Sequence, residues 1–420
     1  MFSRKKEGFL SILDLGATKV CAGVARVDDT GQLELLGLGI YPTRGMRNGS
    51  IVDLDETCGA VRRAVDDAQK GAQTAMGPVT LSVNSRGMKS FNSNGSLQLG
   101  PNPVQITPGF FQKCMDNASN FSVSAFLEPM HIVLRHCTVD EFMEVDNPIG
   151  MEGKKLEVEL HVIALPKTQI THFTKAANQA GLTVQSMLLQ PLASAEASLS
   201  REDKEYGALF LDIGSCTTTG VVYQRGKIQH SFSLPVGGDH FTRDIITGLR
   251  TTMKEAEKLK CLYGTLSSDT GQGASVIEIQ GAGSGKPRQI SVQILTEIIQ
   301  PRAEEILDLV RSEITTAGFE NTQFACAILS GGGALLKDLI GLAEKQLDIP
   351  CRLTGIQLPE KWPAELASPA YASTVGLFHR SLHVQSRGKG ATLEQMVERR
   401  TPLQKSSNRL KHWFDEILSI

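Results

Sequence analysis

Apolar runs alternate with polar, glycine-containing turns over the first part of the chain. Residues 9–40 contain β-rich runs around the turn Asp28-Asp29-Thr30-Gly31, which predicts a β-hairpin. Apolar residues at helical spacing predict a helix from about Asp55 to Ala75, and residues 79–83 predict another strand. This alternation of strands and helices indicates an α/β fold.

Residues 85–164 differ in character from the segment before them. Gly, Asn, Ser and Pro are frequent at first, a short helix is predicted around 108–120, and two strand-forming runs follow. We therefore expect a small α+β unit inserted into a larger domain. A helix from Thr168 to Ala180, ended by Gly181, is predicted after it.

The opening pattern of the chain recurs from residue 208. An apolar strand, an Asp-x-Gly sequence, a short polar turn and a second strand occur around Asp14-Leu15-Gly16 and again around Asp212-Ile213-Gly214. Two copies separated by so long a segment indicate a duplicated, two-lobed domain with a cleft between the lobes.

The later segments also alternate between strands and helices. Residues 237–303 contain two predicted helices and a Gly-rich strand region, and a long helix is predicted over 303–318. Residues 325–339 follow a strand, glycine turn, helix pattern, and a further helix lies within 368–383. From 386 to 407 the chain is polar and charged with Gly and Pro, which is typical of a flexible linker.

Composition and charge exclude several classes of protein. The 420 residues include 43 Lys+Arg and 45 Asp+Glu, a formal net charge of −2, so no basic field favours binding to nucleic acid. The chain contains no run of roughly 18 or more apolar residues, so no bilayer-spanning helix is predicted. The eight cysteines are scattered without a CxxC pattern, which argues against a disulfide framework or a zinc site.

The two Asp-x-Gly turns are the first candidates for chemistry. A tight turn of small residues presents backbone N–H groups and hydroxyls to an anion. An Asp at the end of the preceding strand can hold Mg²⁺ through the water shell of the ion. Asp14 and Asp212 are therefore candidate magnesium residues, and two such turns facing each other would bind the phosphates of a nucleotide.

A glycine turn is the second candidate. The sequence Ser330-Gly331-Gly332-Gly333-Ala334 follows a predicted buried strand and is expected to open a helix, whose N-terminus favours negative charge. The segment from Gly281 to Lys286 looks like a P-loop, but Gln280 and Pro287 stand where a Walker A loop needs Gly and Ser or Thr. We interpret that segment as a flexible hairpin loop.

The last residues follow an amphipathic pattern that predicts a helix over 408–420, with basic residues near its start. Trp and Phe beside basic residues are typical of a helix lying in a membrane interface; the alternatives are a partner-binding helix and a helix docked on the chain's own body. One such helix binds weakly, so firm attachment needs several copies on one scaffold, which favours a polymerising protein. The candidate membrane residues are Leu410, Trp413, Phe414, Ile417 and Leu418.

These motifs, in this order, resemble the actin/Hsp70/hexokinase ATPase superfamily. The resemblance implies a duplicated, two-lobed actin-like (ribonuclease-H-like) α/β fold that binds ATP and Mg²⁺. It implies that Gln190 orients a water for attack on the γ-phosphate or serves as a hinge, and that Glu257 and Lys260 lie near the ribose and adenine. A solvated charged helix face is the alternative for that pair. The implied nucleotide-binding residues are Gly16, Ala17, Thr18, Lys19, Gly214, Ser215, Cys216, Thr217, Glu257, Lys260, Gly331, Gly332 and Gly333.

With its insert and tail, the chain resembles the FtsA family of bacterial cell-division proteins. Residues 147–150, 211–214, 297–302 and 330–333, together with the tail, carry this resemblance. The subdomains it implies are 1A (1–84, 165–192 and about 370–385), 1C (85–164, replacing actin subdomain 1B), 2A (193–227 and 304–369) and 2B (228–303), followed by the linker 386–407 and the membrane-targeting helix 408–420.

Membership in this family would imply an adaptor with at most weak ATPase activity. Such a protein polymerises, binds the C-terminal peptide of FtsZ through subdomain 2B around residues 288–305, and tethers the Z ring to the cytoplasmic face of the plasma (inner) membrane at the division site. It also recruits later division proteins, here through subdomain 1C.

The sequence departs from the family pattern at Ser215, Cys216 and Thr217, where more glycine is common, so nucleotide affinity or hydrolysis is expected to differ. The alternatives are other actin-fold ATPases. One is a sugar kinase, for which the sequence offers no general-base or sugar-pocket motif. The other is a pilus or shape-determining protein, which accounts less well for the insert and the tail.

Overall fold

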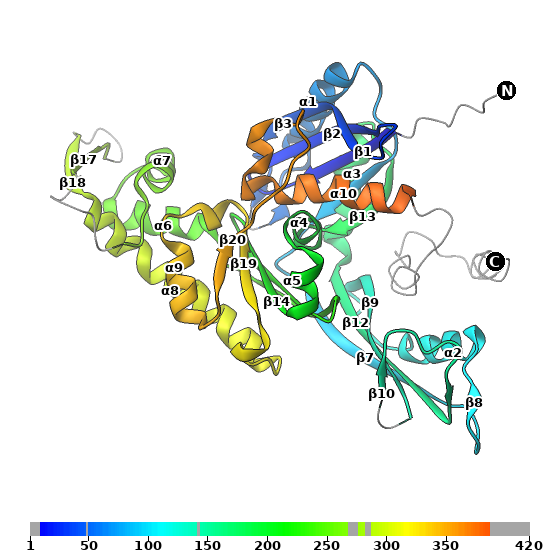
Figure 1. Cartoon of the computed structure of the whole chain (residues 1–420). Coiled ribbons are helices and arrows are strands. Elements are labelled where there is room, and N and C mark those ends of the chain that lie inside the picture. Colours follow the sequence, from blue (N-terminus) through cyan, green and yellow to red (C-terminus); the bar gives the residue numbers. More distant parts are fainter. Residues whose placement is uncertain (1–8, 48, 141–142, 268–275, 282–286, 387–420) are drawn as a thin grey trace. The chain divides into compact units, whose positions relative to one another are not determined.

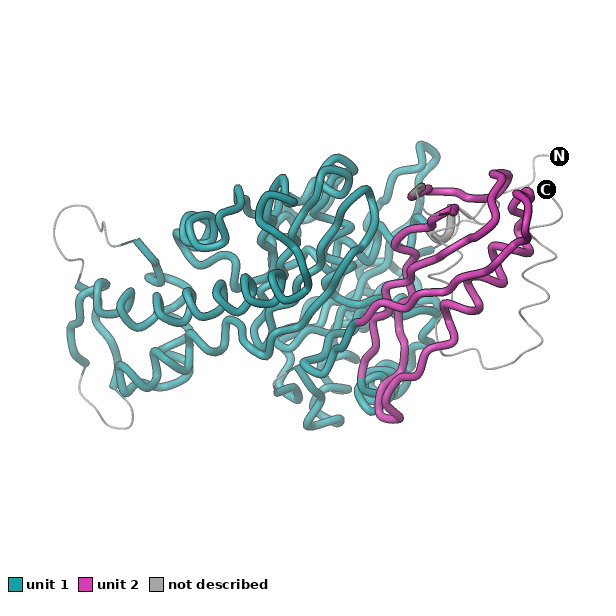
Figure 2. Tube along the Cα trace, turned by 90° about the horizontal axis from the view of Figure 1, so that it is seen from below, with its two compact units in different colours: residues 1–90, 166–390 teal, residues 91–165, 391–420 magenta. Residues whose placement is uncertain are grey.

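The computed structural model describes residues 9–47, 49–140, 143–267, 276–281 and 287–386. The chain divides into two compact units, residues 1–90 with 166–390 and residues 91–165 with 391–420 (Figure 2). The predicted linker 386–407, apart from Ser386 at the end of the last helix, and the predicted helix 408–420 lie outside the described residues. No helix within the described ranges has the length and apolar composition that a membrane span requires.

The larger unit begins with a five-stranded sheet that we call, with its helices, the first lobe (Figure 1). Its strands are β1 (Phe9–Leu15), β2 (Lys19–Val27), β3 (Leu33–Pro42), β6 (Val79–Val83) and β13 (Val184–Leu189), its helices are α1 (Leu54–Ala72), α3 (Lys167–Gln179) and α10 (Ala372–Ser386), and a short pair is β4 (Met46–Arg47) with β5 (Ser50–Ile51). The strand order is β13-β6-β1-β2-β3, with β1 to β3 antiparallel and β6 parallel to β1.

Helix α1 shows how this lobe is held together. Asp53 caps the helix by accepting a hydrogen bond from the Glu56 N–H, and its apolar stripe is buried. The stripe lies directly on the backbone of β3, because a Cβ atom on Gly39 would lie 1.9 Å from the Ala64 carbonyl oxygen. The glycines of β3 therefore allow a closer helix–strand approach than any side chain would permit.

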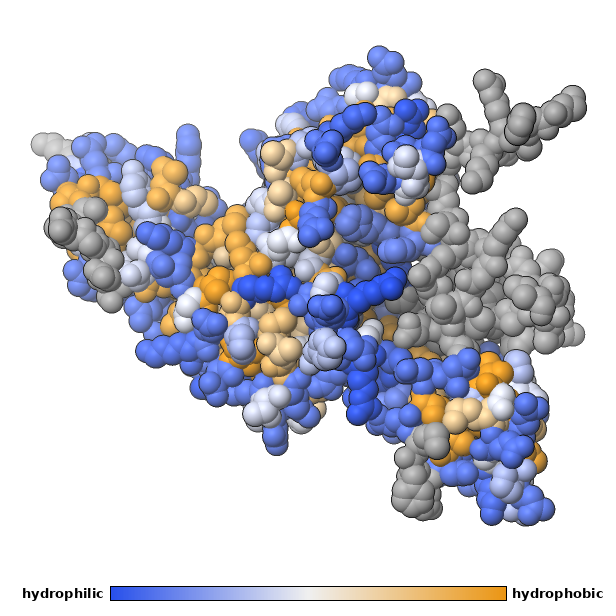
Figure 3. All heavy atoms as spheres, viewed as in Figure 1, coloured by the Kyte–Doolittle hydropathy of each residue, from blue (hydrophilic) through white to orange (hydrophobic). Residues whose placement is uncertain are grey.

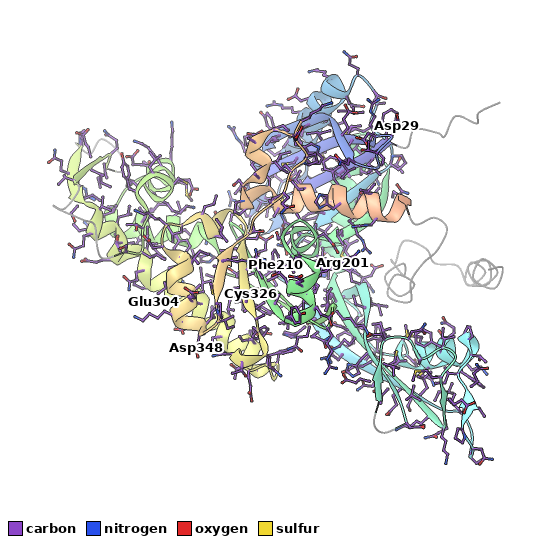
Figure 4. All side chains as sticks on the ribbon, viewed as in Figure 1. Asp29, Arg201, Phe210, Glu304, Cys326 and Asp348 are labelled. Atoms are coloured by element: carbon purple, nitrogen blue, oxygen red, sulfur yellow. The ribbon has the colours of Figure 1, made fainter. Side chains whose placement is uncertain are left out.

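A second five-stranded sheet, which with its helices we call the second lobe, repeats this arrangement. Its strands are β14 (Ala208–Ile213), β15 (Thr218–Gln224), β16 (Lys227–Leu234), β19 (Cys326–Ser330) and β20 (Cys351–Leu353), and its helices are α4 (Gln190–Ser198), α5 (Arg201–Tyr206) and α9 (Leu339–Leu347). The order is β16-β15-β14-β19-β20, again an antiparallel hairpin beside parallel strands. Phe210 of β14 is buried inside this lobe, whereas Asp29 lies on an exposed turn of the first (Figure 4).

Helices α4 and α10 cross at the junction of the two lobes. A Cβ atom on Gly376 of α10 would lie only 1.7 Å from the Ala193 carbonyl oxygen of α4. The two helix backbones are therefore in direct contact, and a side chain at residue 376 would force them apart.

The second lobe carries a further helical region made of α6 (Gly238–Leu249), α7 (Met253–Tyr263), the strand pair β17 (Val276–Ile279) and β18 (Arg288–Ser291), and α8 (Val292–Thr316). The helix predicted from residue 303 therefore begins at Val292, and the predicted boundary at 303/304 falls inside it. Pro301 lies in the helix interior, where it removes a backbone donor. Leu295, Ile299 and Ala303 on either side are fully buried, so packing outweighs this cost.

The smaller unit is an antiparallel sheet covered by one helix. Its strands are β7 (Lys89–Gln98), β9 (Leu127–Val139), β10 (Met143–Val145) and β12 (Lys155–Pro166) in the order β10-β9-β12-β7, with α2 (Pro108–Ala118) and a short pair, β8 (Val104–Gln105) with β11 (Glu152–Gly153). Thr107 caps α2 by accepting from the Phe110 N–H. Gly95 lets α2 lie on β7, because a Cβ there would be 2.4 Å from the Cys114 carbonyl oxygen.

Candidate functional site

A cleft of about 640 Å³ lies within the larger unit and is lined by residues of both lobes. Its volume falls in the range of small-molecule binding sites. Every site residue predicted in the two lobes lines it. These are Asp14, Gly16, Ala17, Thr18, Lys19, Gln190, Asp212, Gly214, Ser215, Cys216, Thr217, Glu257, Lys260, Gly331, Gly332 and Gly333. The membrane residues Leu410, Trp413, Phe414, Ile417 and Leu418 lie outside the described residues.

The two Asp-x-Gly turns have the same backbone geometry. The Gly16 N–H donates to the Lys19 carbonyl oxygen at 3.0 Å, and the Gly214 N–H donates to the Thr217 carbonyl oxygen at 2.9 Å. Each bond closes a tight turn between two antiparallel strands, so both turns bring their tips into the cleft. The local repetition in the sequence thus corresponds to a repeated structure.

Asp14 is a buried carboxylate that accepts three hydroxyl hydrogen bonds. Ser82 donates to Oδ1 at 2.5 Å, and Ser373 and Thr374 donate to Oδ2 at 2.6 and 2.7 Å. The first donor comes from β6, and the other two come from the first turn of α10. The side chain is only 4% exposed, so these bonds replace the water that a charged carboxylate would otherwise bind.

Asp212 occupies the equivalent position in the second Asp-x-Gly turn but has fewer protein hydrogen-bond donors than Asp14. Among the described residues it accepts one hydrogen bond, from the Ser194 hydroxyl of α4 at 2.6 Å. Burial raises the pKa of Asp212 to about 6, the Ser194 bond opposes that shift, and the nearby charge of Asp14 adds to it. Two buried carboxylates that repel each other favour a bound cation.

The donor set of this pair fits a hydrated magnesium ion. Both groups are carboxylates, the hard oxygen ligands that Mg²⁺ prefers. No cluster of three or more His, Cys, Asp or Glu side chains suitable for a metal occurs within the described residues. An ion held by this pair would take its remaining ligands from water and phosphate oxygens, since Mg²⁺ seldom occupies an all-protein cage.

Two of the lysine side chains that line the cleft are held by neighbouring protein groups. Lys19 Nζ donates to the Ala370 carbonyl oxygen at 2.7 Å and lies 3.8 Å from the centre of the Tyr371 ring. Lys260 Nζ lies 2.8 Å from Glu257 Oε2 and donates to the Gly238 carbonyl oxygen at 3.1 Å. The Lys260 cation is therefore fixed against the start of α6 and does not simply extend into solvent.

Glu257 belongs to the same network. It accepts a hydrogen bond from Thr242 at 2.6 Å, and Lys260 donates to the same hydroxyl at 2.9 Å. Burial would raise the pKa of Glu257, but the bonds from Lys260 and Thr242 outweigh it and lower the pKa. The charged pair on α7 is thus held by hydrogen bonds at the cleft wall, while the Glu257 side chain is still 49% exposed to solvent.

The glycine turn has a different structure from the one predicted. Residues Gly332–Leu335 form a short 3-10 helix after β19, and α9 begins only at Leu339, so no α-helix N-terminus faces the cleft at this turn. Gly331 has φ of 82°, and a Cβ there would lie 2.6 Å from Asp212 Oδ1. A Cβ on Gly333 would lie 2.5 Å from the Ile213 side chain. Close packing on β14 therefore explains two of the three glycines.

Several residues that line the cleft were not among the predicted site residues. Asn84 follows β6 directly, Ser194 and Ser373 reach the two aspartates, and Leu262 and Leu335 form an apolar wall. The position of Asn84 at the carboxyl end of a buried parallel strand is a local signal that could have identified it. The serines donate to carboxylates that lie 18 and 359 residues away in the sequence, so no local pattern indicates their role.

The duplicated lobes and the cleft between their facing turns define an actin-like fold. A chain of a PilM-PilN type IV pilus biogenesis complex matches with a TM-score of 0.62 at 16% identity, covering 89% of this chain and 98% of that one. MreB5 of Spiroplasma citri bound to ADP matches with a TM-score of 0.54 at 15% identity, covering 90% and 98%. These likenesses concern the fold alone, and they confirm the predicted two-lobed α/β architecture.

Sequence comparison identifies the family within that class. A model described as cell division protein FtsA matches residues 209–376, and one described as an SHS2 domain inserted in FtsA matches residues 86–164. FtsA of Neisseria meningitidis serogroup B is 31% identical over 382 residues, covering 91% of this chain and 92% of that protein. FtsA of Pseudomonas aeruginosa is 30% identical over 403 residues, covering 96% of each. The chain belongs to the FtsA family of cell-division proteins, as the resemblance predicted.

Proposed function

We propose that this chain is an ATP-binding, actin-like adaptor that tethers the FtsZ ring to the cytoplasmic face of the plasma (inner) membrane at the division site. It polymerises, binds the C-terminal peptide of FtsZ through subdomain 2B, and recruits later division proteins through subdomain 1C (85–164). Its role is structural, with at most weak ATPase activity. Family membership supports this proposal, and the facing pair of Asp-x-Gly turns is the single structural observation that carries its nucleotide part.

The cleft residues would divide the work of binding ATP and Mg²⁺. The turns at Gly16 and Gly214 present small residues to the phosphates, and the apolar wall at Leu335 suits the base. Asp14 and Asp212 would hold the metal ion through its water, and a bound Mg²⁺ supplies positive charge that neutralises the phosphates. Gln190, at the start of α4, is our candidate for orienting a water.

The region around β18 and the first half of α8 is our candidate for the FtsZ peptide. Apolar side chains gather at the surface around β17 and β18 (Figure 3). Val276 is 57% exposed and Ile294 is 43% exposed, both more than is usual for side chains of this size in a folded domain. Exposed apolar groups beside the long helix α8 suit the apolar side chains of a short peptide.

One pair of variants tests this peptide site. Ile294→Glu places a charge within residues 288–305, whereas Leu309→Glu places one on the same helix outside them, at a residue that is 38% exposed. We expect Ile294→Glu to weaken binding of the FtsZ C-terminal peptide at least 10-fold, measured by fluorescence anisotropy with the full chain. Leu309→Glu should bind like the wild type. Equal losses in both variants would contradict the assignment.

The membrane tether would be the amphipathic C-terminal helix, multiplied by polymerisation. Co-sedimentation with anionic liposomes tests it, comparing the full chain with one that ends at Ser407, each with and without ATP. We expect pelleting that depends on the tail and is strengthened by ATP, because a filament carries many tails. Trp413→Glu should abolish pelleting, and Asp415→Asn, on the polar side, should preserve it. Equal pelleting of the long and short chains would rule out this tether.

A further inference from the structure

Asn84 connects the two lobes across the cleft. Its Nδ2 donates to Gln190 Oε1 at 3.3 Å and to the Thr217 hydroxyl oxygen at 3.2 Å. Asn84 follows β6 of the first lobe, Gln190 begins α4, and Thr217 ends the second Asp-x-Gly turn. We call these three residues the Asn84 bridge. It joins the candidate water-orienting glutamine to a candidate phosphate-binding turn.

The direction of this bridge is fixed by the backbone. The Ser85 N–H, which can only donate, is 2.7 Å from Asn84 Oδ1, so the Nδ2 group must face the cleft. The buried Gln169 side chain donates to the Asn84 carbonyl oxygen at 3.4 Å and to the Gly49 carbonyl oxygen at 2.6 Å. Asn84 is therefore held on both its backbone and its side chain before any ligand binds.

This fixed direction also determines which end of the Gln190 amide faces the first turn. Because Asn84 is the donor, Gln190 must turn Oε1 toward it. Gln190 Nε2 then faces the other way and lies 3.9 Å from the place a Cβ atom on Gly16 would occupy. The glutamine thus presents N–H donors toward the turn that would hold phosphate.

The bridge gives a role to a residue that departs from the glycine-rich family pattern. Thr217 supplies a hydroxyl that a glycine at the same place would lack, and this hydroxyl is the partner of Asn84 in the second lobe. The Thr217 methyl group also lies beside the first lobe, because a Cβ atom on Gly49 would lie 3.9 Å from Thr217 Cγ2. Both the hydroxyl and the methyl group of Thr217 therefore lie against the first lobe.

We propose that Asn84 is a positioning residue that holds the cleft closed through Thr217 and, in the same closed state, holds Gln190 with its N–H donors toward the first turn. Asn84 lies in the first lobe, and both of its partners, Gln190 and Thr217, lie in the second. Opening of the lobes therefore breaks both bonds, so the orientation of Gln190 depends on closure. This inference rests on the proposed binding of ATP, and it adds the residue through which closure and the candidate catalytic group are linked.

The proposal is tested by measuring how fast the full chain releases the fluorescent analogue mant-ATP in the presence of Mg²⁺. Stopped-flow fluorescence gives this release rate. Thr217→Val removes the hydroxyl at nearly constant shape, Thr217→Ser keeps it, and Asn84→Ala removes the amide. Loss of one neutral hydrogen bond corresponds to about 5-fold, so Asn84→Ala and Thr217→Val should each speed release about 5-fold. The double variant should release no faster than Asn84→Ala alone, because that variant already lacks the bond to Thr217.

The controls distinguish the bridge from a general loss of structure. Thr247→Val, at an exposed threonine on α6 that does not line the cleft, should release at the wild-type rate. Thr217→Ser, which keeps the hydroxyl, should release more slowly than Thr217→Val. Additive effects in the double variant, or wild-type release by Thr217→Val, would overturn the proposal.

If the wild type did not bind mant-ATP, the proposed function would be contradicted. The Asn84 bridge would then be tested on the free chain, without nucleotide. In that case amide hydrogen exchange of the free chain is the measurement. Asn84→Ala should speed exchange in the hairpin of β14 and β15 about 5-fold, and unchanged exchange would overturn the bridge.

Discussion

The two lobes offer the same backbone to the cleft but surround their aspartates differently. Asp14 pairs with Ser82 on the neighbouring parallel strand, and Asp212 pairs with Ser330 at the equivalent register position. Ser82 donates to Asp14, whereas Ser330 donates to the Pro369 carbonyl oxygen at 3.5 Å. The duplicated strands thus kept a serine in register, and only one of the two serves the carboxylate.

The helices at the junction of the lobes add to the difference between the surroundings of Asp14 and Asp212. The start of α10 gives Asp14 two hydroxyl donors, and α4 gives Asp212 one. Burial raises the pKa of Asp212 to about 6, so its charge is poorly stabilised by the protein alone. We infer that the first lobe has a carboxylate satisfied by protein, and the second has one that depends on a bound cation.

Replacing each aspartate by asparagine should therefore shift stability in opposite directions, and this is the largest effect we expect. The pKa of Asp212 is raised from 3.8 to about 6, so the folded chain binds this proton more tightly and stability falls as the pH rises through that range. Asp212→Asn should recover about 3 kcal/mol of unfolding free energy at pH 8 without nucleotide or metal. Asp14→Asn should lose about 2 kcal/mol, because its hydroxyl donors lose a charged acceptor.

Urea unfolding at pH 8 with EDTA measures both changes. The gain from Asp212→Asn should vanish when the pH is lowered below 3.8, where the wild-type group is protonated in both states. Adding ATP and Mg²⁺ should stabilise the wild type more than Asp212→Asn, since only the wild type has the negative charge of Asp212 beside that of Asp14. Losses of similar size in both variants would show that the two carboxylates are equivalent.

The crossing of α4 and α10 should affect both aspartates at once. A Cβ on Gly376 would meet the Ala193 carbonyl oxygen, so Gly376→Ala should lower the unfolding free energy by about 3 kcal/mol. Gly341→Ala is the matched control, because it lies on α9 with nothing within 4 Å of the added atom, and should be neutral or slightly stabilising. Thermal unfolding of the full chain compares them, and a neutral Gly376→Ala would show that the helices can separate freely.

The sequence was sufficient to predict the parts of the site whose residues lie close together along the chain. The Asp-x-Gly turns were recognised because the bond that closes each turn joins residues three apart, as at Gly16 and Lys19. Their partners could not be predicted, because Ser373 is 359 residues from Asp14 and only the fold brings them together. The duplication itself predicted two similar environments, and the structure shows where they differ.

Two wrong predictions have a common physical cause. The sequence predicts that the long helix begins at residue 303 and that the glycine turn after β19 opens a helix. In both places tertiary packing decides: buried side chains keep α8 helical through Pro301, and contact with Ile213 explains Gly333. Local residue preferences do not contain these contacts.

The two serines in register give the smallest and sharpest test of the comparison. Ser82→Ala removes a donor to Asp14 and the acceptor of the Leu15 N–H, which lies 3.1 Å from the serine oxygen. It should therefore cost about 2 kcal/mol. Ser330→Ala removes a long bond to a carbonyl oxygen and should cost about 0.5 kcal/mol. Both side chains are fully buried, so loss of packing contributes equally to the two values. Urea unfolding at pH 7 measures the difference; equal costs would mean that the asymmetry between the aspartates arises only from α4 and α10.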